Sequence, residues 1–310
     1  MTNYSLFALV ALAVTATHAL PKPGAQLATV TVSPRAALPA ASPYPASPTT
    51  NEFKYRGYDE HSKTDKNNRK IVHDAFTDWS PMLSAAIASL RDTDDLTFNT
   101  WFPKTLEREN FSPLDARGYV EGVITRMFAP GLEPPAPKAI VAKFISEKDD
   151  ISLTCEKDKT VHAYFVKDQG RFHVCPTGLE GVTGASEIDC GKLGNRVGRG
   201  MESLTQTLVH EFFHSNLVGD KAPSSAGHIV DIIYGSSGCM RMVKGDKAQE
   251  AFINADSYTW FATNAYYNSV CERKFSLPEV TQEDFDYSEA ELLASPEYDA
   301  ALSDGVLAGV

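Results

Sequence analysis

Two histidines and a glutamate form the most informative chemical motif of this sequence, His210-Glu211-Phe212-Phe213-His214. Side chains four residues apart lie on one face of a helix, so both imidazoles can reach the same metal ion. Glu211 directly follows the first histidine, where its carboxylate can hydrogen-bond a metal-bound water and take its proton. Zinc accepts these ligand types, and a catalytic zinc keeps one position for water. The motif therefore predicts a hydrolase with one Zn²⁺ per chain.

The residues around this motif are predicted to form the helix that positions it. The alternative is an amphipathic helix that carries two histidines by chance, but only 8 histidines occur in 310 residues. Apolar residues recur at steps of three and four, as on the buried face of a helix. They are Met201, Leu204, Leu208 and Phe212. We expect this helix to end at Gly219-Asp220.

A site with two histidines needs a third protein ligand, and three carboxylates are candidates. Asp220 lies six residues after His214, as in metzincin-like enzymes, but Leu217 occupies the position where those enzymes have glycine. Glu250 would need a downstream helix to bring it to the metal, as in gluzincins. The third candidate is Asp231. Spacing alone does not choose among them.

Two segments that follow the motif carry a family resemblance. Residues 231–235 are similar to the Asp-x-x-Tyr-Gly element of the deuterolysin-type, or aspzincin, secreted fungal metalloendopeptidases. Residues 254–262 are similar to the Asn-Ala-Asp-x-Tyr-x-x-Phe-Ala segment of the same family, and the likeness covers about residues 150–271. The resemblance implies that Asp231 is the third zinc ligand and that the Tyr234 hydroxyl stabilises the tetrahedral intermediate.

The sequence departs from the family pattern just before Asp231. The family usually has Gly-Thr-x-Asp here, whereas Gly227 stands one residue farther away and His228 replaces the threonine. The interval from His214 to Asp231 is also longer than the family pattern. We expect His228 to be a solvated loop residue, with an approach to the metal or the substrate as the alternative. Asp256 is expected to orient a ligand or to cap the last helix.

Five cysteines leave one unpaired if the others form disulfides. The sequence alone leaves the connectivity open. The order of the cysteines resembles two family bridges, which implies Cys155–Cys175 and Cys190–Cys271 and leaves Cys239 unpaired.

The two ends of the chain differ in composition from its middle. A short apolar run at residues 6–14 predicts a signal peptide over residues 1–19, and hence a secreted, extracellular protein. Residues 20–60 are rich in Pro, Ala and Ser, as in a linker or a pro-segment. Residues 61–275 are predicted to form the catalytic domain. Residues 276–310 carry nine acidic residues and no Lys or Arg, which predicts a disordered acidic tail.

Composition and charge restrict the possible partners. A hydrophobic content of 43% is ordinary for a packed globular protein, and the formal net charge of −11 comes largely from the tail. No basic stripe suggests a nucleic acid, and no apolar segment is long enough to span a bilayer. We therefore expect a protein or peptide substrate, no nucleic-acid or membrane partner, and a monomer, although the sequence does not fix the oligomeric state.

The order of the patterns predicts an α+β fold. It is a zincin-like metallopeptidase domain with N-terminal helices, a small β-sheet, the HExxH active-site helix and a C-terminal helix. Helical spacing covers residues 71–90, with a break or kink at Pro81, and a capped helix is expected to start at Ser112-Pro113. The predicted strands cover residues 151–155, 161–166 and 171–175.

These residues together predict metal-assisted peptide hydrolysis. His210, His214 and Asp231 would hold Zn²⁺, Glu211 would move the water proton to the leaving amine, and Tyr234 would donate a hydrogen bond to the oxyanion. The rival hypothesis is a secreted zinc-binding or antigen protein without catalysis on the same fold. A structural zinc site has four protein ligands and does not need Glu211, so the intact motif favours the enzyme.

Overall fold

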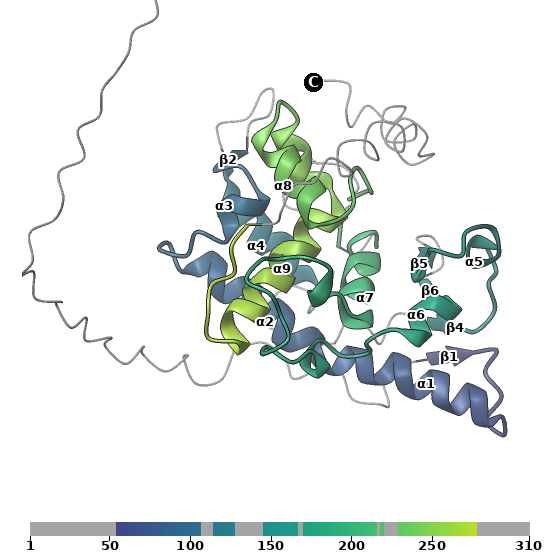
Figure 1. Cartoon of the computed structure of the whole chain (residues 1–310). Helices are drawn as coiled ribbons and strands as arrows, with labels where there is room; N and C mark the ends of the chain where they lie inside the picture. Colours follow the sequence, from purple (N-terminus) through teal and green to yellow (C-terminus); the bar gives the residue numbers. More distant parts are fainter. Residues whose placement is uncertain are drawn as a thin grey trace, which may run out of the picture. The chain divides into compact units, whose positions relative to one another are not determined.

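The computed structural model describes residues 54–106, 114–127, 145–166, 170–215, 218–219 and 229–277 (Figure 1). They all fall in the second of two compact units of the chain, residues 42–310. The predicted signal peptide, most of the predicted linker and all but two residues of the acidic tail lie outside the described residues. Asp220 and His228 also lie outside them. Within these ranges, no helix is both long and apolar enough to cross a membrane.

Helices of different lengths make up most of the described residues. The α-helices are α1 (Lys63–Ala75), α2 (Trp79–Arg91), α3 (Phe98–Trp101), α4 (Ala116–Arg126), α5 (Thr154–Lys157), α6 (Pro176–Glu180), α7 (Leu204–Phe213), α8 (Ser236–Lys244) and α9 (Ala255–Val270). The 3₁₀ helices are η1 (Phe76–Asp78), η4 (Ala185–Glu187), η5 (Arg199–Met201) and η6 (Ala248–Ile253). The strands are β1 (Lys54–Arg56), β2 (Thr105–Leu106), β3 (Leu114–Asp115), β4 (Ile145–Glu147), β5 (Ala163–Val166) and β6 (Arg171–Val174).

The small sheet that the sequence predicts is present and has the strand order β1-β4-β6-β5. The pairs β1–β4 and β4–β6 are parallel, and β5 pairs with β6 in the antiparallel sense. Two predicted strands, over residues 161–166 and 171–175, correspond to β5 and β6. Residues 54–56, which fall within the predicted linker, form β1 and pair with β4.

The predicted strand over residues 151–155 is wrong. This segment forms a turn followed by α5, because the Asp150 carboxylate accepts hydrogen bonds from the backbone N–H groups of Thr154 and Glu156. Leu153 has a positive φ of 56°, which an extended strand cannot accommodate. The strand of this region is β4 instead.

The helix break predicted at Pro81 is close to the observed one, whereas the helix predicted after Ser112 begins later. α1 ends at Ala75 and α2 begins at Trp79, so Pro81 lies in the first turn of α2, where its missing N–H needs no partner. α4 begins at Ala116 rather than after Ser112. Its N-cap is Asp115, whose side chain accepts a hydrogen bond from the backbone N–H of Arg117.

An aromatic cluster fixes α7 between the sheet and the N-terminal helices. Phe212 of α7 lies with its ring centroid 5.3 Å from Phe172 of β6, 5.7 Å from Phe76 of η1 and 5.0 Å from Trp79 of α2. All four side chains are buried, and each contributes roughly 2–3 kcal/mol by leaving water. On another face, α7 packs against α9, which also packs along α2 (Figure 1). α7 is therefore held from several sides.

Both disulfides that the family resemblance implies are present. Cys155 is bonded to Cys175 and Cys190 to Cys271, with Cα–Cα distances of 5.6 and 5.5 Å. Cys239 is a buried free thiol. The second bridge ties the loop before α7 to the end of α9. Close to it, the first residue of the predicted tail, Ser276, exchanges backbone hydrogen bonds with residues 195 and 197.

Candidate metal centre

α7 carries the first four residues of the HExxH motif, and the last follows it directly. Ser203 caps the helix, because its side chain accepts a hydrogen bond from the backbone N–H of Gln206. The helix ends at Phe213 and His214 is its C-cap residue, so the predicted end at Gly219 is wrong by about a turn and a half. His214 keeps right-handed helical φ and ψ angles (−71° and −11°), so it stays on the face of His210.

Three donor groups converge beside this helix. His210 Nε2 lies 2.9 Å from Asp231 Oδ1, His214 Nε2 lies 3.2 Å from Asp231 Oδ2, and the two Nε2 atoms are 3.4 Å apart. The three side chains are largely buried and form a group whose donor atoms all lie within 4.8 Å of one another. Asp231, which comes from the segment between the end of α7 and α8, is thus brought to the histidines.

Glu250, the other described candidate for a third ligand, is not part of this group. It lies buried in η6, and the charged residues that act on its carboxyl are Lys247 and Asp246. Burial raises the pKa of this carboxyl. Glu250 is therefore separate from the metal-compatible group, and Asp220 lies outside the described residues.

The outer nitrogen of each histidine is held by a hydrogen bond. His210 Nδ1 lies 2.7 Å from Asp256 Oδ1, and His214 Nδ1 lies 3.0 Å from the backbone oxygen of Ile229. Since both partners are acceptors, each ring donates from Nδ1, which directs Nε2 towards the site, where a metal ion can bind it once the ring is neutral. Asp256 thus orients a histidine, which is the first of the two roles expected for it. The Ile229 contact had no sequence signal, because any residue can supply a backbone oxygen.

Interactions between charged side chains outweigh burial in setting the pKa values of His210, His214 and Asp231. Burial alone would lower the pKa of His210, but the carboxylates of Asp231 and Asp256 raise it well above its usual value. Burial likewise opposes the charged form of His214, and Asp231 raises its pKa. Burial would raise the pKa of Asp231, yet the two imidazoles hold it well below its usual range. The pocket therefore stabilises a carboxylate between two nitrogen donors.

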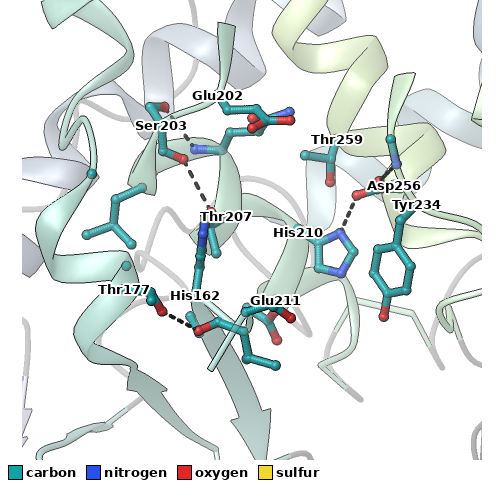
Figure 2. A pocket seen from close by; sticks show the side chains of 18 of the residues that line it. His162, Thr177, Glu202, Ser203, Thr207, His210, Glu211, Tyr234, Asp256 and Thr259 are labelled. Carbon is teal, nitrogen blue, oxygen red and sulfur yellow. Dashed lines mark hydrogen bonds and ion pairs between the residues drawn. The ribbon is translucent and has the colours of Figure 1, made fainter. Parts of the chain in front are cut away.

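Glu211 and Tyr234 flank the converging donors. Both line one cavity of about 670 Å³ together with His210, and Figure 2 shows them on opposite sides of that histidine. The Tyr234 ring stacks against His210 with centroids 5.9 Å apart and remains 59% exposed. The side chain of Tyr234 is therefore accessible to a ligand in the cavity. Three of the five residues that the sequence predicts for the site thus line this cavity, and His210 also belongs to the donor group with His214 and Asp231.

The backbone at Gly235 constrains the segment that carries Asp231 and Tyr234. Gly235 has φ 78° and ψ 157°, a region that only glycine adopts readily. Its N–H donates a 2.6 Å hydrogen bond to Asp256 Oδ2. The same carboxylate therefore holds both His210 and the end of the Asp231–Gly235 segment.

Gly235→Ala is expected to lower the free energy of unfolding by about 1–3 kcal/mol, because alanine cannot hold this backbone conformation without strain. No atom lies within 4 Å of an added Cβ, so the effect is conformational rather than steric. Gly181→Ala is the matched control, since its site is equally open but has φ −82°. Urea unfolding measures both, and an equal loss in the two variants would contradict the expectation.

Comparison with known proteins finds a family model and a solved structure that resemble part of this chain. Residues 139–263 match the model of the aspzincin family, described as lysine-specific metallo-endopeptidases. Among solved structures, a zinc peptidase from Grifola frondosa matches with 16% identity and a TM-score of 0.44, over 66% of this chain and 96% of that chain. No curated protein sequence matches significantly. The family match confirms the resemblance drawn from the Asp231 and Asn254 segments, so residues 139–263 of this chain are similar to the aspzincin family of metallo-endopeptidases.

Proposed function

We propose that this protein is a secreted zinc-dependent endopeptidase that hydrolyses peptide bonds with water. In this proposal, His210, His214 and Asp231 hold one Zn²⁺, and Glu211 and Tyr234 are the catalytic residues. The observation that supports it most is the convergence of two imidazole nitrogens and a carboxylate directly beside Glu211. The match of residues 139–263 to a family of metallo-endopeptidases also supports it.

The donor set suits zinc in its chemistry and its spacing. Ligand atoms on a tetrahedral zinc lie about 3.3 Å apart, given bonds of about 2.0–2.1 Å. The donor separations beside α7 range from 2.9 to 3.4 Å. Asp231 Oδ1 is also a buried acceptor that receives no hydrogen bond among the described residues. Zn²⁺ bound here by two neutral ligands and one anion would polarise the scissile carbonyl and acidify water.

The chain's own groups would then handle protons and developing charge. Glu211 accepts a proton from the attacking water and delivers it to the leaving amine nitrogen. Tyr234 donates its hydroxyl proton in a hydrogen bond to the carbonyl oxygen as negative charge develops on that oxygen. Asp256 keeps the His210 ring fixed through Nδ1 while this happens.

The cavity offers a place for an extended peptide. β5 is an edge strand of the sheet and contacts α7, and residues 161–163 at its start line the cavity together with Glu211. A peptide could add to this edge by backbone hydrogen bonds and bring its scissile bond to the metal. The family description names lysine, and the carboxylates of Asp158 and Glu202 in the cavity wall suit a basic side chain.

The proposal predicts that the purified protein binds one zinc per chain and cleaves unfolded casein. Removal of the metal by a chelator should abolish cleavage, and zinc should restore it. Zinc content by atomic absorption and cleavage sites by mass spectrometry provide the measurements. Stoichiometric zinc without any cleavage would favour the non-catalytic zinc-binding protein instead, and protein that does not bind zinc would exclude both hypotheses.

A further inference from the structure

Asn254 stands at a helix start but does not cap the helix. It is the N-cap residue of α9, and its side chain makes no capping hydrogen bond. Asparagine at this position normally accepts from an N–H group of its own helix. Here the N–H of Ser257 donates to the backbone oxygen of Asn254 instead. The fully buried amide is therefore used for something else.

The Asn254 amide holds the segment that carries the proposed site residues. Its Oδ1 accepts from the backbone N–H groups of Ile232 and Ile233, at 2.9 and 3.1 Å. Its Nδ2 donates to Ser257 Oγ at 3.0 Å and to Cys239 Sγ at 3.5 Å. Two donors and two acceptors surround the amide in the one orientation that satisfies all of them. Asparagine satisfies all four of these hydrogen-bonding partners at this position.

These bonds belong to a larger set that fastens residues 230–235 to the start of α9. The other members are Val230 N–H to Ile253 O at 2.8 Å, Ala255 N–H to Val230 O at 2.9 Å, and Gly235 N–H to Asp256 Oδ2 at 2.6 Å. Asp231 therefore lies between the tethered residues Val230 and Ile232. Tyr234 lies in the same way between Ile233 and Gly235. For each of them, one neighbour is held by Asn254.

We propose that Asn254 is the positioning residue that sets Asp231 and Tyr234 in a common register, an inference that rests on the proposed function. Its amide oxygen accepts hydrogen bonds from the N–H groups of Ile232 and Ile233, the two residues between Asp231 and Tyr234. These bonds fix the backbone there and so set the separation of the Asp231 and Tyr234 side chains. Loss of these bonds lets both side chains shift, and displacements of about 1 Å are enough to weaken a metal site and slow its chemistry.

Asn254→Ser separates this role from helix capping. Serine is a good N-cap residue, so α9 should keep its start, but its short side chain cannot reach the two N–H groups in the same way. We expect the zinc dissociation constant to rise about 10–100-fold, as for other residues that support metal ligands. The kcat of the zinc-saturated variant should fall about tenfold or more, with KM within about threefold, because register affects the transition state more than binding.

The matched control is Asn264→Ser on the same helix. Asn264 is also buried, and its Oδ1 accepts from the Trp101 indole N–H at 3.3 Å, away from residues 230–235. It should lower the melting temperature but leave the zinc dissociation constant within about twofold of the wild type. Wild-type zinc affinity and kcat in Asn254→Ser would overturn the proposal. Equal weakening of zinc binding in both variants would also overturn it.

Hydrogen exchange in the wild-type protein tests the two hydrogen bonds to Asn254 Oδ1 directly and does not depend on whether a variant folds. In wild-type protein freed of zinc, the amide protons of Ile232 and Ile233 should exchange at least about 100-fold more slowly than in an unstructured peptide. If these amide protons exchange at the rates of an unstructured peptide, the proposed hydrogen bonds to Asn254 do not hold the segment, and this conclusion stands even if Asn254→Ser fails to fold. If the proposed function is wrong, the wild-type protein itself will not bind zinc or will not cleave peptides. That outcome differs from loss of the Asn254 hydrogen bonds, which the exchange measurement reports.

Discussion

Glu211→Gln is expected to lower kcat for peptide hydrolysis about 10²–10⁴-fold, because glutamine cannot accept the proton of the attacking water. The substitution preserves the size of the side chain and leaves His210, His214 and Asp231 in place. The zinc dissociation constant should therefore stay within about threefold of the wild type. Steady-state kinetics on zinc-loaded protein and competition with a chromogenic chelator measure the two quantities separately.

Glu187→Gln provides the control for this experiment. Glu187 is an exposed glutamate of η4, outside the cavity, so its loss of charge should leave kcat within about twofold of the wild type. If zinc-loaded Glu211→Gln turns over peptide at the wild-type rate, Glu211 is not the base and the mechanism proposed here is wrong.

The residues of the HExxH motif were predictable because the spacing of residues along a helix determines which of its faces their side chains share. His210, Glu211 and His214 needed only the three- and four-residue periodicity of a helix. The end of α7 was misplaced because glycine at position 219 resembles a helix stop, whereas the chain already turns after Phe213. The position of Asp231 required the family resemblance, since three carboxylates were equally compatible with the spacing.

The remaining contacts of the site depend on residues that are distant in the chain. Asp256 reaches His210 over 46 positions, and Asn254 reaches Ile232 over 22. The block of residues 254–262 indicated that this helix matters, but no local pattern assigns its asparagine to a particular pair of N–H groups. The same limit applies to the misassigned strand over residues 151–155, where the bonds made by Asp150 outweigh a favourable strand composition.

Asp231→Ala is expected to raise the zinc dissociation constant more than about 100-fold, since it removes a direct ligand rather than a supporting residue. The loss has two physical parts. One oxygen donor disappears, and the anion that balances the metal charge beside two buried imidazoles disappears with it. Peptidase activity at ordinary zinc concentrations should be lost in parallel and should recover partly in excess zinc.

Glu250→Gln is the matched control, because it neutralises a buried carboxyl that lies outside the donor group. Glu250 Oε2 accepts no hydrogen bond among the described residues, and burial raises the pKa of its carboxyl, so the neutral amide should be tolerated. Zinc affinity should stay within about twofold of the wild type. Asp220→Ala completes the comparison. If Asp220→Ala releases the metal while Asp231→Ala retains it, the third ligand is Asp220, and the convergence of Asp231 on the two histidines is then an ion pair rather than a zinc site.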